Sequence, residues 1–125
     1  MTNYQIGDFL IKIKNVALAG QSEVTDTATR GKLAVVKALE KAGFVENHKT
    51  AAGGLTLKLK FEHKKPVLLD LKLVSKPGRR VYLRAADLRK KRGSSVYLLH
   101  SHRGVLLSQE AVKANIGGEV IAEVW

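Results

Sequence analysis

The first half of the chain carries apolar residues at helical spacing in two places. Apolar positions three and four apart predict an amphipathic helix over about residues 4 to 15, with Thr2 or Asn3 available as its N-cap. A second helix is predicted to begin after Thr29 and to end at Gly43, where a left-handed residue is needed. The polar stretch between them, residues 20 to 29, leaves room for one rung of an early strand at Val24.

Strand spacing follows. Apolar and polar residues alternate from Leu55 to Phe61, which predicts a strand with one solvated face, and the turn at residues 51–54 joins it to a strand that starts at Phe44. The same alternation recurs from Val67 to Leu73, after a break at Pro66. The predicted order is therefore helix, strand, helix, strand, strand, with a further strand near Val67.

The second half reads as short strands joined by glycine-containing turns, which favours an antiparallel sheet. The predicted strands cover residues 80–84, 95–100, 105–107 and 119–125. One short helix interrupts them: Ser108 can cap it, Glu110 suits its positive end, and Gly117-Gly118 ends it. We therefore predict an α+β fold, with an N-terminal α-β-α-β-β subdomain (residues 1–73) packed without a linker against a C-terminal, mostly antiparallel β subdomain with a short helix (residues 74–125).

The charge distribution points to an anionic partner. The 125 residues carry a formal net charge of +11, and residues 63–125 hold 13 basic and 5 acidic side chains against 9 and 6 in residues 1–62. A surplus of this size in a folded segment indicates nucleic acid. The absence of cysteine excludes disulfides, thiolate nucleophiles and Cys-ligated zinc. No apolar run is long enough to span a bilayer and no signal sequence is evident, so we expect a cytoplasmic protein without a membrane partner.

The segment from Val74 to Arg84 concentrates groups that bind polyanions. Pro77 and Gly78 suit the two central positions of a type II turn, and Lys76 and Arg79 flank that turn. Arg79 and Arg84 match phosphate oxygens, and Tyr82 offers a face on which a base can stack. The same residues also fit a simpler interpretation, a basic hairpin that is only solvated.

A second group lies in the loop His100-Ser101-His102-Arg103-Gly104, between two apolar strands. Its imidazoles, hydroxyl and guanidinium can donate to phosphate or accept a stacked base, although polar residues also simply make good turns. Gly118-Glu119 is a further candidate: glycine allows a close approach of two backbones, and the carboxylate could accept from a base amino group or brace the loop. On local grounds, these residues fit equally well a helix end followed by a residue at a strand edge.

Motifs for catalysis are missing. The sequence contains no phosphate-binding glycine loop, no His-Glu-x-x-His helix and no Gly-x-Ser-x-Gly elbow. The acidic residues Asp8, Glu40 and Glu46 do not form a pair suited to general acid–base catalysis. We expect them on solvated helix faces and at helix caps. We expect no enzymatic activity, no cofactor, no metal and no small-molecule substrate.

Taken in order, several segments resemble small-subunit ribosomal protein eight in its bacterial form. The resemblance covers nearly the whole chain. The turn and strand from Val74 to Tyr82 match the family's signature, and the order and spacing of all the segments make the resemblance specific. The other segments are Ile6–Asn15, Lys32-Leu33, Glu40–Val45, Arg103–Val105, Gly118–Ile121 and Glu123–Trp125.

This resemblance implies a structural constituent of the small ribosomal subunit, located in the cytoplasm, that binds the central domain of small-subunit rRNA and nucleates assembly of the platform beside neighbouring ribosomal proteins. The family pattern places Lys32, Tyr82, residues 100–102, Arg103 and Gly118-Glu119 at or beside RNA. Lys76, Arg79 and Arg84 are added from charge and geometry. The family's Ser-Thr-Ser loop corresponds here to His100-Ser101-His102, so only the middle residue keeps a hydroxyl.

Two other functions use the same residues. A non-ribosomal RNA chaperone or an autoregulatory mRNA-binding protein would need the same basic surface. A metal-assisted ribonuclease would instead use His100, His102 and Glu119 as ligands, and the lack of a carboxylate cluster argues against it.

Overall fold

The N-terminal half forms the predicted series of helices and strands. The computed structural model describes residues 4–125, so the predicted caps Thr2 and Asn3 lie outside the described residues. The elements are α1 (Tyr4–Leu18), β1 (Glu23–Thr27), α2 (Arg30–Ala42), β2 (Val45–Ala51) and β3 (Gly54–Leu59). Helix α1 runs three residues further than predicted, because the buried Ala17 extends its apolar stripe by another turn.

Helix α2 begins and ends where the sequence predicts. The Thr29 hydroxyl accepts a hydrogen bond from the backbone N–H of Lys32 at 3.2 Å, and Gly43 adopts φ +88° at the end of the helix. Strand β3 lies between β1 and β2 in a three-stranded antiparallel sheet. Its apolar residues Leu55, Leu57 and Leu59 are fully buried in the core that α1 and α2 share with this sheet.

The predicted strand from Val67 is wrong over most of its length. Residues Phe61–Glu62 (β4) and Lys65–Pro66 (β5) form a small hairpin, and only Leu71–Leu73 (β6) continue as a strand. The alternation breaks between them, because Leu68 is buried whereas Leu69 is 65% exposed. The backbone N–H groups of Leu69 and Asp70 both donate to the carbonyl of Trp125, which turns the chain before β6 starts.

The C-terminal half contains one helix more than predicted. Its elements are β7 (Tyr82–Leu83), α3 (Ala85–Arg89), β8 (Val96–Ser101), β9 (Gly104–Leu107), α4 (Ser108–Ala114) and β10 (Gly118–Val124). The strand predicted for residues 80–84 ends at Leu83, because Asp87 accepts from the backbone N–H of Arg84 at 3.1 Å and so starts α3. Helix α4 ends at Ala114, with Asn115 as its left-handed C-cap at φ +57°, and not at the glycine pair that was predicted to end it.

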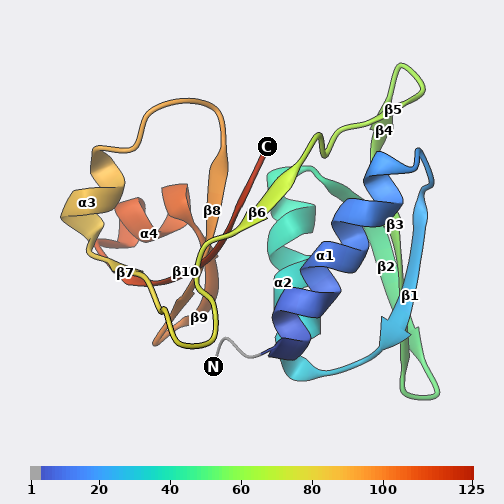
Figure 1. Cartoon of the computed structure of the whole chain (residues 1–125), viewed down its shortest axis with the longest axis horizontal. Helices are drawn as coiled ribbons and strands as arrows, with labels where there is room; N and C mark the ends of the chain where they lie inside the picture. The colour runs from blue at the N-terminus through green and yellow to red at the C-terminus, as the bar shows by residue number, and fades with distance from the viewer. Residues whose placement is uncertain (1–3) are drawn as a thin grey trace.

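The second sheet has β10 at its centre. The strand order is β6-β10-β8-β9, and β7 pairs with the start of β10 on the same side as β6. One face, called the inner face, carries Leu98, Leu107, Ala122 and Val124 and packs toward α1 and α2. The other, called the outer face, packs against α3 and α4 through a separate cluster that includes Leu88, Leu99, Ala111 and Val120. Figure 1 shows the resulting layers, from α3 and α4 across this sheet to α1 and α2 and then to the three-stranded sheet.

The two halves share one hydrophobic core. The larger buried cluster contains residues of the N-terminal helices, such as Phe9 and Leu39, together with Leu98 and Ile121 of the C-terminal sheet. Strand β6, on the N-terminal side of the predicted division after residue 73, pairs with β10 and so belongs to the C-terminal sheet. Among the described residues, no helix has the length and apolar character needed to cross a membrane.

Candidate nucleic-acid interface

Three of the predicted site residues form a row across the C-terminal sheet. Glu119 at the start of β10 lies opposite Tyr82 of β7 on one side and opposite His100 of β8 on the other. Residues directly opposite each other in antiparallel strands present their side chains on the same face. The row therefore brings a phenol ring, a carboxylate and an imidazole from three separate segments together on the inner face.

The exposure of these side chains differs across the row. Tyr82 is 69% exposed, whereas Glu119 is 3% exposed. The Glu119 carboxylate accepts a hydrogen bond from the guanidinium of Arg80 at 3.2 Å, so its charge is compensated inside the protein. Tyr82 thus supplies the accessible aromatic face, while Glu119 and Arg80 fix the strand beneath it.

His100 is half-buried at the other end of the row. Burial lowers the pKa of its imidazole, and the neighbouring Glu119 carboxylate opposes that effect without reversing it. His100 is consequently a neutral imidazole at pH 7, able to donate one hydrogen bond and accept another.

The loop after His100 is a tight turn held by Ser101. The Ser101 hydroxyl donates to the carbonyl of Gly104 at 3.0 Å and accepts from the backbone N–H of Arg103 at 3.1 Å. Gly104 takes φ +92°, a conformation that other residues rarely adopt. Both hydrogen bonds of the Ser101 hydroxyl lie within the turn, and this residue is only 8% exposed. The groups presented to a ligand are therefore the exposed side chains of His102 and Arg103.

The glycine pair before Glu119 allows strands to approach closely. A Cβ atom on Gly118 would lie 2.6 Å from the carbonyl oxygen of His100, and one on Gly117 would lie 2.5 Å from that of Leu83. No side chain fits at either position without moving a backbone. The pair therefore sets the spacing of β7, β10 and β8, and with it the spacing of the row.

The basic turn between β6 and β7 is fixed to the same sheet. Lys76 and Arg79 exchange two backbone hydrogen bonds of 2.9 Å across the turn, and Gly78 has φ +82°, as a type II turn requires. The buried Ser75 anchors the hairpin, because its hydroxyl accepts from the backbone N–H of Val81 at 2.9 Å. Figure 1 shows this connection, in yellow, and the β8–β9 turn at the same lower end of the C-terminal half.

Two predicted site residues lie apart from this group. Lys32 is 6% exposed at the start of α2, and its ammonium group donates to Thr27 at 2.9 Å and to Asp26 at 3.2 Å. Arg84 lies beyond β7 at the start of α3, where its side chain is exposed and lies 3.5 Å from the Asp87 carboxylate. The ammonium group of Lys32 is thus bound to residues of the N-terminal half. Arg84, in contrast, extends the basic surface along the edge of the sheet.

Sequence reasoning missed Arg80 as a member of the site. Two positions before Tyr82, it lies on the same face of an extended segment, and this spacing was the available signal. Its partner could not be identified from the sequence, since nothing there places β7 beside β10.

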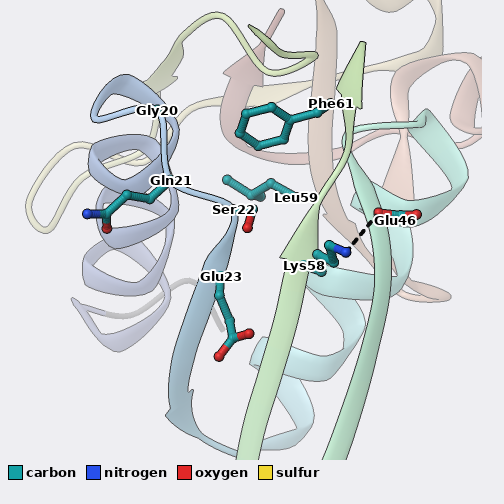
Figure 2. A pocket seen from close by; sticks show the side chains of 8 residues that line it. All are labelled: Gly20, Gln21, Ser22, Glu23, Glu46, Lys58, Leu59 and Phe61. Atoms are coloured by element: carbon teal, nitrogen blue, oxygen red, sulfur yellow. Dashed lines mark ion pairs between the residues drawn. The ribbon is translucent and has the colours of Figure 1, made fainter. Parts of the chain in front are cut away.

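The N-terminal half has a surface hollow, and its lining differs in charge from the row and the two basic turns. Figure 2 shows that it is lined by the α1–β1 connection, the start of β1 and the end of β3, with Phe61 above it. Its charged residues are Glu23, Glu46 and Lys58, and the ammonium group of Lys58 lies 4.0 Å from the Glu46 carboxylate. With two carboxylates and one paired cation, this hollow is not suited to an anion.

Comparison with known proteins identifies the family. The family model for ribosomal protein S8 matches residues 4–125. The chain belongs to the ribosomal protein S8 family. It is 35% identical to the small ribosomal subunit protein uS8 of Chloroflexus aggregans, over 98% of both chains.

Other members of the family agree in length. The protein of the same name from Nitratidesulfovibrio vulgaris strain DP4 is 36% identical over 96% of both chains. That of Cereibacter sphaeroides strain KD131 is 36% identical over 98% of this chain and 99% of its own. The predicted resemblance and fold class are confirmed. The S8 family is a family of ribosomal proteins, and the relatives compared are proteins of the small ribosomal subunit.

Proposed function

We propose that this member of the S8 family binds the central domain of small-subunit rRNA through its C-terminal sheet and helps to nucleate assembly of the small ribosomal subunit. Membership of the family supports a ribosomal role. The single observation that supports RNA contact is the row of Tyr82, Glu119 and His100 on one face, with two turns beside it that carry exposed cations.

Each part of this surface has a distinct task in the proposed complex. Arg79, Arg103 and Lys76 neutralise phosphates, which supplies affinity without sequence preference. Tyr82 provides a face for an unstacked base, and the neutral His100 and exposed His102 read hydrogen-bonding edges or phosphate oxygens. The buried Glu119 and Ser101 touch no ligand in this arrangement and instead hold the binding groups in place.

Salt dependence tests the phosphate contacts. The logarithm of the affinity for a central-domain rRNA fragment is expected to fall linearly with the logarithm of the salt concentration. Arg79→Gln should weaken binding at every salt concentration and make the slope shallower by about 1. Arg84→Gln should act in the same direction. Lys49→Gln on the exposed strand β2 of the other sheet is the matched control and should leave the slope unchanged.

Specificity is tested by comparing RNAs. The protein should bind the central-domain fragment at least tenfold more tightly than an equally long fragment from another rRNA domain, and Tyr82→Leu should reduce this ratio. Equal affinity for both fragments, or affinity that does not respond to salt, would refute the proposal. Binding to its own messenger RNA in preference to rRNA, with no co-sedimentation with small subunits, would favour the autoregulatory function.

A further inference from the structure

A second hollow, which unlike the first is basic, lies on the outer face of the C-terminal sheet. Its volume is about 390 Å³, and it lies beside the hairpin that carries Lys76 and Arg79. Tyr97 of β8, Glu123 of β10 and Lys72 of β6 form a row across it, because Glu123 lies opposite both of the others. The remaining lining comes from Leu73, Val74 and Val81.

A bulge in β10 creates this row. Strand β10 slips by one residue against β8 between Val120 and Ala122. In regular alternation Glu119 and Glu123 would share a face, but the extra residue turns Glu123 to the outer face. The sheet therefore has a carboxylate and a tyrosine on each face: Glu119 with Tyr82 on the inner face, and Glu123 with Tyr97 on the outer one.

The floor of the hollow is held in place by the protein itself. The Glu123 carboxylate accepts from the Ser95 hydroxyl at 2.5 Å. The ammonium group of Lys91 lies 5.2 Å from the centre of the Tyr97 ring and donates to the Ser95 carbonyl. The aromatic ring and the carboxylate are thus positioned before any ligand arrives.

The rim of the hollow carries basic side chains whose charges are not paired with other described residues. Lys72, Lys76 and Arg79 are exposed, and no side-chain hydrogen bond or ion pair joins any of them to another described residue. Three accessible positive charges around an aromatic floor fit the phosphates and the base of a nucleotide. An acidic peptide fits less well, because Glu123 would repel a carboxylate that reached the floor.

We propose that this hollow binds one unpaired nucleotide of the RNA, with its base on Tyr97, its exocyclic amine on Glu123 and its flanking phosphates on Lys72, Lys76 and Arg79. This inference rests on the proposed function. The RNA strand then passes over the Lys76–Arg79 hairpin, which connects β6 to β7 at the side of the sheet, and contacts both faces.

Mononucleotides test the hollow without the ribosomal RNA. Titration of the isotope-labelled full chain with AMP, GMP, CMP or UMP should shift the NMR signals of the Tyr97 ring and of the amides of Lys72 and Lys76. AMP, GMP and CMP carry an exocyclic amine and should bind more tightly than UMP, and Glu123→Gln should reduce this preference. Nucleotides that leave Tyr97 unshifted, while a glutamate-rich peptide shifts it, would overturn the proposal in favour of a protein partner.

Variants test its contribution to RNA binding. Tyr97→Leu should lower the affinity for the central-domain rRNA fragment by about tenfold, and Tyr97→Phe should stay within about twofold of the wild type. Lys72→Gln should lower the affinity about threefold and make the salt slope shallower by about 1, whereas the control Lys49→Gln should change neither. The Phe variant retains the ring, so loss of stacking is separated from loss of folding.

The outcomes separate this inference from the function on which it rests. If the wild type does not distinguish the central-domain fragment from other RNA, the proposed function fails, whatever the mononucleotides show. If the wild type binds that fragment specifically and Tyr82→Leu weakens binding, but Tyr97→Leu and Lys72→Gln bind like the wild type, only the second hollow is refuted.

Discussion

Replacing Gly118 by alanine tests whether close strand spacing holds the binding row together. The added Cβ would lie 2.6 Å from the carbonyl oxygen and 3.1 Å from the carbonyl carbon of His100, where ordinary contacts begin at 3.4 Å. Both atoms belong to the backbone of β8, so no side chain can rotate away. Relieving the overlap requires β10 and β8 to separate by about 0.8 Å, which stretches the hydrogen bonds between them.

The expected loss follows from this displacement. Overpacking of a rigid site costs about 1–3 kcal/mol, and we expect the upper part of that range because two backbones must move. For a chain of this length the melting temperature should fall by about 10 °C. Affinity for the rRNA fragment should also fall at temperatures where the variant is fully folded, because His100 moves away from Glu119 and Tyr82.

The assay is thermal and urea unfolding of Gly118→Ala beside the control Gly7→Ala. A Cβ on Gly7 in α1 meets only a Leu73 methyl group, at 3.4 Å, and alanine is the better helix former by about 1 kcal/mol. Gly7→Ala should therefore melt at or above the wild-type temperature. A Gly118→Ala protein that melts like the wild type and binds RNA equally well would show that strand spacing at this point does not set the site.

Three further predictions concern charged groups. Lys32→Met should lower the free energy of unfolding by about 2 kcal/mol in urea, because it leaves the Asp26 carboxylate without the buried ammonium that lies 3.2 Å away; an unchanged urea midpoint would contradict this. Burial acts to raise the pKa of Asp26, but the backbone N–H of Thr27 and the ammonium group of Lys32 outweigh it, so that the pKa lies below 3.8. The resulting stabilisation is complete above pH 3.8 and is lost as the pH falls through the lowered value, so melting curves between pH 7 and 2 should be less pH-dependent for Asp26→Asn. Burial lowers the pKa of His100, so any gain in RNA affinity from its protonation should begin below pH 6.5 and disappear in His100→Gln; identical pH profiles for the two proteins would exclude this role.

The sequence was sufficient wherever a single residue type determined the local backbone. Thr29 and Gly43 bounded α2 correctly because a capping hydroxyl and a left-handed residue act within one turn of the helix. Pro77 and Gly78 likewise predicted the turn of the basic hairpin. In each case the determining interaction spans only a few residues.

The predictions failed where distant segments decided the outcome. Leu69 fits a strand by spacing, but the carbonyl of Trp125 draws its backbone out of register. Gly117-Gly118 was predicted both to end the helix and to allow two backbones to approach closely. Only the second prediction holds, and the backbones approached, at Leu83 and His100, lie far away in the sequence. Neither constraint is visible locally, since each depends on which strands become neighbours.

The same distinction applies to the site. Charge and residue type pointed to both turns and to Tyr82, whereas the pairing of Glu119 with Arg80 and the row on β7, β10 and β8 required the sheet. The family resemblance predicts Lys32 at or beside RNA, and this stays a prediction. What the sequence does not reveal is that its ammonium group is buried beside Asp26 and Phe9.

The core that joins the two halves has a consequence for how the protein responds to its partner. Because Phe9 and Leu39 pack in the same cluster as Leu98 and Ile121, neither half can open without exposing the other. A ligand gripped only by the C-terminal sheet therefore raises the cost of opening everywhere. Amide protons in α1 and α2 should therefore exchange more slowly with solvent once the C-terminal sheet holds RNA.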